Sequence, residues 1–554
     1  MFTIAAVFQT GAFYFYLWRN LRRSLHMMQQ NSYYNDRYTQ WLKRNPSRLP
    51  GYLLLATIIT SVLLRGFLSL NLYLFLHGAL FLALSFVRSK TKEKTPLVFT
   101  WRVKRLLVTA GILCFLYIWG MSLLFPETFW WEIPFLQALL NWLLQVVIVA
   151  ANLINKPLEK RIADGFIRDA NRILEEHPGL TVIGITGSYG KTSTKHILHH
   201  LLGARYEVLM TPESYNTTMG VVRTIREQLK ATHKIFVVEM GAKKPGDIRE
   251  ICQMVRPVAG IITSIGEMHL DTFETMENIV QTKFELAEAV GSEGLMVLND
   301  DNFYVRHQKV AAPALRYRTK TENAGEDEWQ GMHADVWAEN IQSGPDGSQF
   351  DMCFEGGGRL SLHTKLLGRH NVLNILAAAT TAIAFGIKPR DLPQHVGSLE
   401  PVPHRLQLLP QSGSYRIIDD AYNANPEGAG EALEILGGFP GYRVMITPGM
   451  VELGAMEESA NRKLGSQAAQ HCDHLIIVGK NRAAALEEGA RSGGLDESCI
   501  YVAKDIHDAL AKANQLADQL APENGPMTVL LENDLPDSFL ESVAAQQTGR
   551  RDRE

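Results

Sequence analysis

The pattern of apolar positions along the chain separates two unlike parts. Residues 1–155 are dense in Leu, Phe, Trp and Tyr, whereas residues 156–554 mix charged and apolar positions and are punctuated by glycine. In the first part, long apolar stretches fall at about 1–18, 51–64, 67–86, 106–125 and 134–155. A membrane-spanning helix needs about 20 mainly apolar residues. The pattern therefore predicts an α-helical transmembrane module of about five helices, with the first stretch marginal in length and the second short.

Charged residues between the stretches orient this module. Basic residues gather at 19–49, at 88–105 and from Lys156 onward, whereas the loop 126–133 carries only Glu127 and Glu132. Because basic loops stay on the cytoplasmic side, we expect a multi-pass protein whose remaining part lies in the cytoplasm. Residues 1–18 have no basic start and no small-residue cleavage site, which predicts a retained helix. Ionisable residues within the spans are limited to Arg65 and His77, which favours an anchor over a conduction path.

Beyond residue 156 the periodicity changes to alternating strands and helices. Apolar runs that predict strands fall at 180–186, 235–239, 259–263 and 294–298, and helical patterns lie at 159–176, 191–203, 219–230, 246–254 and 275–290. This alternation is typical of an α/β domain with a mainly parallel sheet. Residues 332–366 instead predict a small antiparallel sheet, followed by a helix at about 371–385.

Pro401-Val402-Pro403 marks a linker to a second α/β domain. After it, strand patterns at 415–419, 442–447, 474–478 and 527–532 alternate with helices. We therefore expect a transmembrane module at 1–155, a central α/β domain at 156–400 and a C-terminal Rossmann-like domain at 401–554. The net charge of −3 gives no reason to expect nucleic-acid binding, and the five scattered cysteines favour neither a disulfide framework nor a zinc site.

A glycine-rich segment lies between the predicted strand 180–186 and the predicted helix 191–203. Residues 184–193 read Gly-Ile-Thr-Gly-Ser-Tyr-Gly-Lys-Thr-Ser. The glycines of such a loop let backbone N–H groups close on phosphate oxygens, and the following helix N-terminus adds positive potential. Lys191 can reach the outer phosphates, and the Thr192 hydroxyl can hold Mg²⁺. The segment therefore predicts that the chain binds a nucleoside triphosphate.

Three further residues are candidates for chemistry near this loop. Glu239 ends the predicted strand 235–239, where a carboxylate can hold Mg²⁺, although an ordinary strand-end acid fits the same pattern. His269 follows the predicted strand 259–263, and a lone histidine there is usually structural. Lys283 lies in the helical pattern 275–290, where an unmodified surface lysine is the alternative to a special role.

Seven segments in order resemble the Mur ligase family, the ATP-dependent enzymes that build the peptidoglycan stem peptide, and their relatives the folylpolyglutamate synthetases. These segments are the loop 184–193, Ser214-Tyr215-Asn216-Thr217-Thr218, Glu239-Met240-Gly241-Ala242, Gly266-Glu267-Met268-His269, Gly368-Arg369-His370-Asn371, Pro403-His404-Arg405 and Asp419-Asp420-Ala421-Tyr422-Asn423-Ala424-Asn425-Pro426. The last segment is closest to the branch that adds D-alanyl-D-alanine to UDP-N-acetylmuramoyl-tripeptide. The resemblance implies a P-loop central domain and a C-terminal domain of the kind found in this family.

The resemblance also implies a role for each matching residue. Asn371 would contact the adenine, Asp420 the ribose and Arg405 the γ-phosphate. The full set of nucleotide-binding residues would be Gly187, Ser188, Gly190, Lys191, Thr192, Ser193, Asn216, Asn371, Arg405 and Asp420. Mg²⁺ would be held by Thr192, Glu239, His269 and Lys283, the lysine as a carbamate. Catalysis would depend on Lys191, His269, Lys283 and Arg405.

Two features depart from the family pattern, and both concern the substrates. Stem-peptide ligases begin with a domain that binds the UDP-sugar end of the substrate, and here the predicted spans stand in its place. The branch that adds D-alanyl-D-alanine has a Lys-Gly-Ser-Arg segment after its last strand. This chain instead reads Glu532-Asn533-Asp534-Leu535-Pro536 at that point.

We therefore expect a membrane-anchored, ATP- and Mg²⁺-dependent amide ligase of the bacterial plasma membrane that takes part in cell-wall biogenesis. It would join an amino acid or short peptide, through an acyl phosphate, to a carboxylate of a lipid-linked or polymeric envelope molecule. A ligase similar to the poly-γ-glutamate synthases is the alternative substrate class. From a different class, the chain would be a nucleotide-dependent regulator of a membrane partner without ligase activity. The absence of polar residues in the spans argues against an ATP-driven transporter.

Overall fold

The computed structural model forms two compact units, Met1–Gly165 and Phe166–Glu554. The residues that it describes are 2–44, 59–60, 67–86, 96–126, 128–213, 215–268, 270–320, 334–409, 415–421, 426–451, 453, 456–480 and 482–533.

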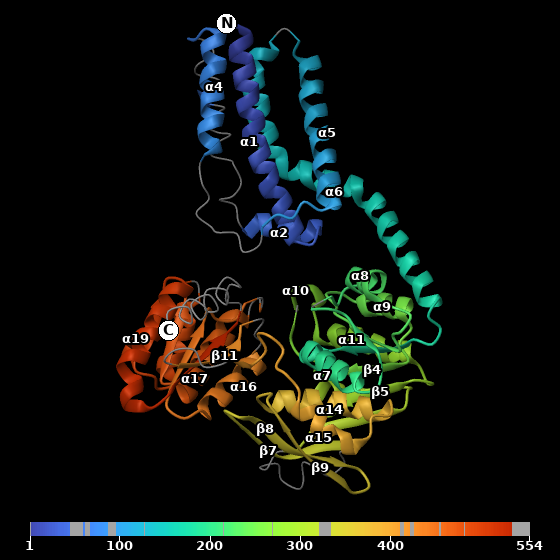
Figure 1. Ribbon diagram of the computed structural model, residues 1–554. Coiled ribbons are helices and arrows are strands. Elements are labelled where there is room, and N and C mark those ends of the chain that lie inside the picture. Colours follow the sequence, from blue (N-terminus) through green and yellow to red (C-terminus); the bar gives the residue numbers. More distant parts are fainter. Residues whose placement is uncertain are drawn as a thin grey trace, which may run out of the picture. The chain divides into compact units, whose positions relative to one another are not determined.

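The first unit is helical. Its helices are α1 (Phe2–Gln30), α2 (Asn35–Arg44), α4 (Leu70–Ser85), α5 (Trp101–Leu124) and α6 (Phe129–Glu175), the last of which continues into the second unit. Figure 1 shows α1, α4, α5 and the first part of α6 running alongside one another (blue to cyan). Their facing sides bury aromatic and aliphatic residues such as Phe13, Phe81 and Leu144, and α5 exposes Trp101, Phe115 and Trp119.

Two described helices, α5 and α6, are long and apolar enough to cross a membrane, at positions where the sequence predicts spans. The other three expected spans do not gain this support. Helix α4 has 16 residues, which is short for a span. Helix α1 has 29 residues but is not among the helices that combine the length and the apolar composition of a span. The expected span at 51–64 lies outside the described residues except at 59–60.

Helix α6 corrects one predicted boundary. The sequence predicts a span at 134–155 and a separate helix at 159–176, but a single helix of 47 residues runs through both, with Pro134 and Pro157 inside it. A proline removes one N–H donor from a helix interior, yet α6 continues as a single helix through Pro157.

Polar residues are buried inside the first unit, which corrects the expectation that the spans lack them. Gln9 of α1 hydrogen-bonds to Gln137 of α6, and both side chains are buried. Asn20 donates to Asn141 over 2.8 Å, and Tyr38 donates to Gln145. The sequence argument considered ionisable groups, whereas amides can lie in an apolar interior when they hydrogen-bond to one another.

The central domain of the second unit contains one nine-stranded sheet, in the order β2-β3-β1-β4-β5-β6-β7-β8-β9. Neighbouring strands from β2 to β7 are parallel, and β8 and β9 are antiparallel to their neighbours. The strands are β1 (Thr181–Thr186), β2 (Val208–Met210), β3 (Ile235–Glu239), β4 (Ala259–Ile262), β5 (Leu295–Asn299), β6 (Ala314–Thr319), β7 (Val336–Gly344), β8 (Gly347–Phe354) and β9 (Gly358–Thr364).

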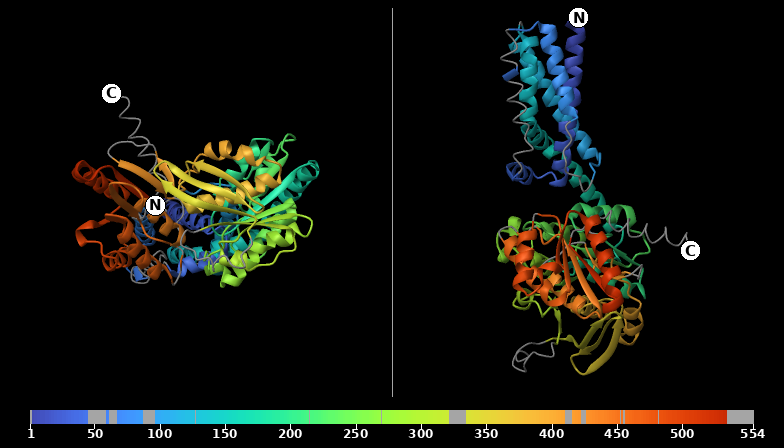
Figure 2. Two further views of the ribbon diagram at one scale, coloured as in Figure 1. Left: turned by 90° about the horizontal axis from the view of Figure 1, so that it is seen from below. Right: turned by 90° about the vertical axis from the view of Figure 1, so that its left-hand side faces the viewer.

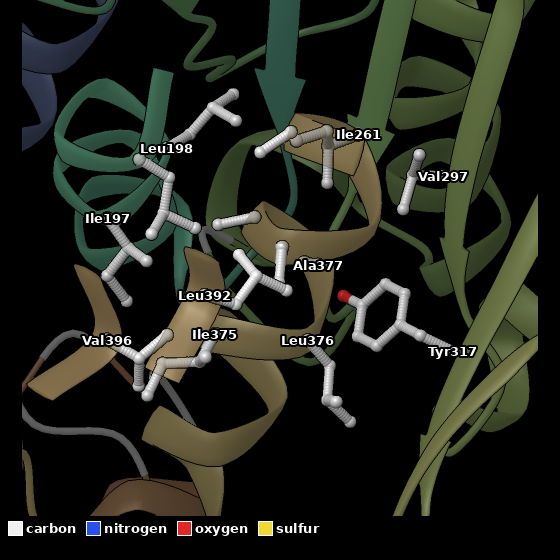
Figure 3. Close-up of a cluster of buried hydrophobic side chains, with 14 of the residues drawn as sticks. Ile197, Leu198, Ile261, Val297, Tyr317, Ile375, Leu376, Ala377, Leu392 and Val396 are labelled. Atoms are coloured by element: carbon white, nitrogen blue, oxygen red, sulfur yellow. The ribbon is translucent and has the colours of Figure 1, made fainter. Parts of the chain in front are cut away.

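The helices of this domain lie on both faces of the sheet. They are α7 (Lys191–Gly203), α8 (Thr218–Gln228), α9 (Asp247–Val255), α10 (Leu270–Phe273), α11 (Met276–Val290), α12 (Phe303–Arg306), α14 (Arg369–Ala384) and α15 (Leu392–Gly397). Ile183 and Ile185 of β1 pack with α7, α14 and α15, whereas Val182 packs with α8, α9 and α11. Figure 3 shows part of the first of these cores, in which Ile375 of α14 lies beside Leu392 and Val396 of α15. This alternation along β1 is the period of a strand buried on both sides.

The region 332–366 differs from the prediction in one respect. Its three strands are antiparallel to one another, as expected, but they do not form a separate sheet. Strand β6, which the sequence analysis missed, pairs in parallel with β7 and joins the hairpins to the main sheet. Phe350 and Met352 consequently belong to the same core as the phosphate-loop helix α7.

The C-terminal domain contains a six-stranded sheet, in the order β10-β11-β15-β12-β13-β14, in which β10 alone is antiparallel. Its strands are β10 (Gln407–Leu409), β11 (Tyr415–Asp420), β12 (Tyr442–Thr447), β13 (His474–Val478), β14 (Ile500–Ala503) and β15 (Met527–Glu532). Helices α16 (Pro426–Gly437), α17 (Glu457–His471) and α18 (Ala483–Ser492) cover one face, and α19 (Ile506–Asn524) covers the other. Figure 2 shows these strands (orange to red) flanked by helices.

Candidate nucleotide-binding site

The phosphate loop connects β1 to α7, as the sequence predicts. Gly187 and Gly190 have φ of 149° and 79°, a region that favours glycine. A Cβ atom on Gly187 would lie 2.1 Å from Thr263 Oγ1, and one on Gly190 would lie 2.5 Å from Asn374 Oδ1. Both positions therefore need glycine for space as well as for conformation.

The segment after β4 holds the loop in place. The backbone N–H of Ser188 donates to the Ser264 carbonyl over 2.6 Å, and the Ser188 hydroxyl donates to the Gly266 carbonyl over 3.0 Å. Thr263 Oγ1 donates to the Tyr189 carbonyl over 2.5 Å. The loop is therefore preorganised by hydrogen bonds within the protein.

Lys191 begins α7 and turns back over the loop. Its Nζ donates to the carbonyl oxygens of Gly187 over 2.7 Å and of Ser188 over 2.9 Å. Burial lowers the pKa of Lys191 to about 8, the positive charge of Arg405 adds to this effect, and Glu239 opposes it. Lys191 is thus half-buried at the loop, where the sequence predicts a phosphate-binding cation.

A buried ion pair lies beside Lys191. Lys195 Nζ lies 3.0 Å from Glu239 Oε2, and both side chains are at most 1% exposed. Asn216 donates to Glu239 Oε1 over 3.1 Å. Burial raises the pKa of Glu239, but the charges of Lys195 and Lys191 more than offset this, so that its pKa lies below the usual value. Glu239 is therefore an ionised carboxylate at the end of β3, next to the loop.

Lys283 is buried in α11 and is not a surface lysine. Burial lowers the pKa of its amine to about 7, and the charge of Lys191 contributes in the same direction. The acids Asp247, Glu285 and Glu239 oppose this lowering. The neutral form of Lys283 is therefore far more populated near pH 7 than that of an ordinary lysine, of which fewer than about one in a thousand is neutral.

Asn371 and Asn374 connect the loop helix to α14. Asn371 Nδ2 donates to the Leu367 carbonyl over 2.9 Å, and Thr194 of α7 donates to Asn374 Oδ1 over 3.1 Å. Asn374 also donates to Asn371 Oδ1 over 3.3 Å. The side chain predicted to contact adenine is therefore held by α14 at the back of the loop.

The C-terminal domain contributes charged groups to the same region. The positive charge of Arg405 acts on both Lys191 and Asp420. Burial raises the pKa of Asp420, and the charges of His370 and Arg405 offset only part of this increase. Asp420 ends β11, and its Oδ1 accepts a hydrogen bond of 3.1 Å from the Leu406 backbone N–H. His370 of α14 contacts Glu431 of α16 over 2.6 Å. The structure thus brings Lys191, Glu239, Arg405 and Asp420 into one connected set of charges.

The remaining predicted site residues are either half-buried at the start of α7 or outside the described residues. Thr192 and Ser193 lie half-buried in the first turn of α7. His269 lies outside the described residues, as do residues 422–425 of the segment that begins at Asp419. The roles of all these residues toward a ligand stay predictions.

Several polar residues of the site were missed by the sequence analysis. Lys195 lies one helical turn after Lys191, and that spacing of four residues was a signal that both face the same side. Thr263 and Asn374 gave no sequence signal, because their importance depends on contacts with Gly187 and Gly190.

The described residues fit a Mg²⁺ ion of the kind that Mg²⁺-nucleotide sites hold. Such a site needs one or two carboxylates together with phosphate oxygens. Glu239 supplies an ionised carboxylate and Thr192 a hydroxyl near the loop. No group of three or more His, Cys, Asp or Glu side chains that could hold a metal by themselves lies within the described part of the chain.

The site combines a phosphate loop between a parallel strand and a helix, an ionised carboxylate beside that loop, and an arginine from a second α/β domain. These features define a nucleotide-binding protein with two α/β domains. Residues 185–382 match the model of the Mur ligase middle domain, and residues 404–524 match that of the Mur ligase glutamate ligase domain. The chain belongs to the Mur ligase family, whose members are ATP-dependent, ADP-forming amide ligases.

Similar proteins of known name are ligases of cell-wall synthesis. The UDP-N-acetylmuramoyl-tripeptide–D-alanyl-D-alanine ligase of Mycobacterium tuberculosis (strain H37Rv) is 30% identical over 363 residues, 62% of this chain and 69% of that protein. The Bacillus subtilis enzyme of the same name is 30% identical over 315 residues, and the match spans 65% of its length and 56% of this chain. A crystal structure of MurF from Acinetobacter baumannii superposes with a TM-score of 0.60 at 25% identity, covering 70% of this chain and 80% of that one.

Proposed function

We propose that the protein is a membrane-anchored, ATP-dependent carboxylate–amine ligase of the cell envelope. The observation that carries this proposal is the single set of charges formed by Lys191, Glu239 and Arg405, contributed by both domains of a Mur ligase fold. A triphosphate-binding site alone would not need the second domain, whereas joining two substrates does.

The proposed reaction proceeds in two steps. A substrate carboxylate attacks the γ-phosphorus of ATP, and ADP leaves with the electrons of the broken P–O bond, which gives an acyl phosphate. An amine then attacks the activated carbonyl carbon, loses a proton and displaces phosphate. The first step brings two anions together, so that fixed positive charge from Lys191 and Arg405 is the main contribution of the chain.

The arrangement of the site suggests which side chains would bind Mg²⁺. Thr192 and Glu239 would hold Mg²⁺, which when bound neutralises phosphate charge. Lys195 and Asn216 hold the Glu239 carboxylate in a fixed orientation through contacts of 3.0 and 3.1 Å. The buried, partly neutral amine of Lys283 is suited to react with carbon dioxide to form a carbamate, which would add a second carboxylate-like ligand.

The decisive test compares full-length protein in detergent with the Lys191→Ala variant. We expect phosphate release from ATP and Mg²⁺ to require both an acid and an amine in the mixture, and to be lost in the variant by at least about 100-fold because a fixed transition-state charge is removed. The acids to be tried are envelope precursors, including lipid-linked ones, and γ-glutamyl oligomers. ATP hydrolysis that is independent of both substrates would indicate a regulator instead, and full activity of the variant would refute the proposal.

Membrane anchoring is supported by α5 and α6, the two described helices with the length and apolar composition of a span. The test is a set of alkaline phosphatase fusions, a reporter that is active only outside the cytoplasm. We expect activity for a fusion after residue 128, between α5 and α6, and none for a fusion after residue 175 at the end of α6. Activity in the reverse order would overturn the proposed orientation, and release of the full-length protein by alkaline carbonate would overturn anchoring.

A further inference from the structure

The first turns of α5 and the middle of α6 lie side by side in the helical unit. Arg105 of α5 pairs with Glu159 of α6 over 2.6 Å, and Thr109 donates to Asn155 over 2.9 Å. Residues four apart are about one turn apart on a helix, so these two contacts align the helices over that length. The proposed topology places this region at the inner surface of the membrane.

Four exposed basic side chains surround the Arg105–Glu159 pair. We call this set the inner-end surface, and it consists of Lys104, Lys156, Lys160 and Arg161. Among the described residues no carboxylate forms an ion pair with any of the four, because Glu159, the acid between them in sequence, is engaged by Arg105. The Lys104 ammonium lies 4.4 Å from the centre of the Trp101 ring. The inner-end surface therefore has four positive charges available to a ligand.

Large apolar side chains are exposed beside these charges. Trp101 is 73% exposed, Leu153 is 54% exposed and Leu158 is 46% exposed. Leu153 and Lys156 are three residues apart, so they are neighbours on the surface of α6. Tryptophan rings and long basic side chains gather where the headgroups of a bilayer meet its acyl chains, because their apolar and polar parts then contact different layers.

The combination of charge and apolar surface selects the kind of partner. A negatively charged phospholipid offers phosphate oxygens to the basic side chains and acyl chains to the leucines. A nucleic acid or an acidic soluble protein would match the charges and leave the apolar side chains in water. A zwitterionic phospholipid would cover the apolar side chains, but its headgroup cation is repelled by the four basic residues.

We propose that the inner-end surface binds the headgroups of anionic phospholipids in the inner leaflet. This inference goes beyond the ligase activity and rests only on the proposed membrane anchoring. Basic residues beside a span also help to orient a protein during insertion. The proposal gives Lys104, Lys156, Lys160 and Arg161 a second role, because they stay exposed and unpaired by acids in the folded unit.

The test measures lipid association with full-length protein in phosphatidylcholine vesicles. The probes are traces of spin-labelled phosphatidylglycerol and spin-labelled phosphatidylcholine, whose motionally restricted fractions report contact with the protein. We expect phosphatidylglycerol to associate at least about threefold more than phosphatidylcholine at low salt, within the factor of about five that one basic side chain near an anionic surface can supply. The preference should fall toward one in 1 M salt, because exposed charges are then screened within about 3 Å.

Three sets of substitutions assign the preference to this surface. Replacing all four residues by Gln should remove it, whereas Lys104→Arg, Lys156→Arg and Lys160→Arg together should keep it, because the charges remain. The matched control removes four exposed basic residues of the second unit and should also keep it, with the changes Lys230→Gln, Lys388→Gln, Arg390→Gln and Lys463→Gln.

Equal association of the two lipids with the unaltered protein would overturn the inference, whether or not any variant inserts correctly. A preference that survives the four Gln substitutions, or that the control substitutions remove equally, would also overturn it. An alkaline phosphatase fusion after residue 175 shows whether the four-Gln variant keeps its orientation. Failure of membrane anchoring has a different signature, since the protein would then be released by alkaline carbonate from vesicles of either lipid.

Discussion

At the scale of single residues, the site depends on charges that are buried and paired. Lys195 and Glu239 are almost inaccessible to water and lie 3.0 Å apart. If Lys195 is replaced by Met, the Glu239 carboxylate keeps its burial and loses its main counter-charge. Removing one partner of a buried pair costs about 3–5 kcal/mol, and we therefore expect thermal unfolding to shift down by roughly 10 °C.

The control for this prediction is Lys365→Met. Lys365 pairs with Glu400 over 2.5 Å, but both side chains are more than half exposed. An exposed pair contributes about 0–1 kcal/mol, so this variant should unfold close to the temperature of the unaltered protein. Equal shifts in the two variants would contradict the claim that burial makes the Lys195–Glu239 pair important.

Lys283 leads to a prediction about pH. Carbon dioxide reacts with a neutral amine, and the pKa of Lys283 is lowered by burial to about 7. As the pH falls through about 7 the amine takes up a proton, so the carbamate should be lost on the acidic side and retained above it. With ¹³C-labelled bicarbonate, a carbamate carbon signal should grow from about pH 6 to about pH 8. The signal should be absent in Lys283→Arg, and an identical signal in that variant would assign it to another amine.

The residues that carry this chemistry were only partly predictable from the sequence. The loop 184–193 and the strand-end Glu239 stand in continuous motifs, and the structure places them together as expected. Glu532 was visible as an acid at the end of a predicted strand, but its position beside Asp420 depends on strands β11 and β15 being neighbours. Such a property of pairing between distant segments cannot be obtained from local pattern alone.

At the scale of secondary-structure elements, strands that contain a continuous apolar run were predictable, whereas β6, an interior strand of its sheet, was not. The predicted bounds of β3, β12 and β13 agree with the structure, because each of these strands contains a continuous apolar run. Strand β6 reads Ala-Leu-Arg-Tyr-Arg-Thr, and its charged residues hid it. Those charges are tolerated because Arg316 pairs with Asp300 over 2.7 Å.

Helix α6 exposes apolar side chains and turns a row of amide side chains toward the interior of the helical unit. Its residues Gln137, Asn141, Gln145, Asn152 and Asn155 recur at spacings of three, four or seven, and so lie along one face. They hydrogen-bond to α1, α2, α5 and the turn between α1 and α2. In an apolar environment such bonds select which helices pack together.

We therefore predict that Asn141→Leu weakens the helical unit and that a second change restores it. The single variant removes the 2.8 Å partner of the half-buried Asn20, and losing a hydrogen bond at such a position costs up to about 1–3 kcal/mol. The double variant Asn20→Leu, Asn141→Leu replaces both groups by apolar ones and should recover most of this loss. Unfolding in a denaturing detergent measures the difference, with Trp142→Leu, a change at a side chain 45% exposed, as the control. Additive losses in the double variant would contradict a specific Asn20–Asn141 pair.

At the scale of the whole second unit, one contact connects the central and C-terminal domains through a titratable group. His370 of α14 lies 2.6 Å from Glu431 of α16, and a Cβ on the neighbouring Gly368 would lie 2.6 Å from Ile435. Burial lowers the pKa of His370, and the charge of Arg405 acts in the same direction. The hydrogen bond to Glu431 and the charge of Asp420 raise the pKa by more than this. The net effect is a raised pKa.

The sign of the pH dependence follows from this raised value. A histidine whose pKa is higher in the paired state stabilises that state fully below its ordinary pKa of about 6.5, and the contribution is lost as the pH rises through the raised value. We therefore expect the two domains to stay together at mildly acidic pH and to separate more often above it. Pulsed electron paramagnetic resonance between spin labels on the exposed Glu293 and Glu497 positions, replaced by Cys, should show a distance distribution that broadens with rising pH. Glu431→Gln should give the broad distribution at every pH, because it removes the carboxylate that holds the proton on His370. A distribution that does not change with pH in the unaltered protein would mean that domain contact is set by apolar packing at Ile435 and not by this ion pair.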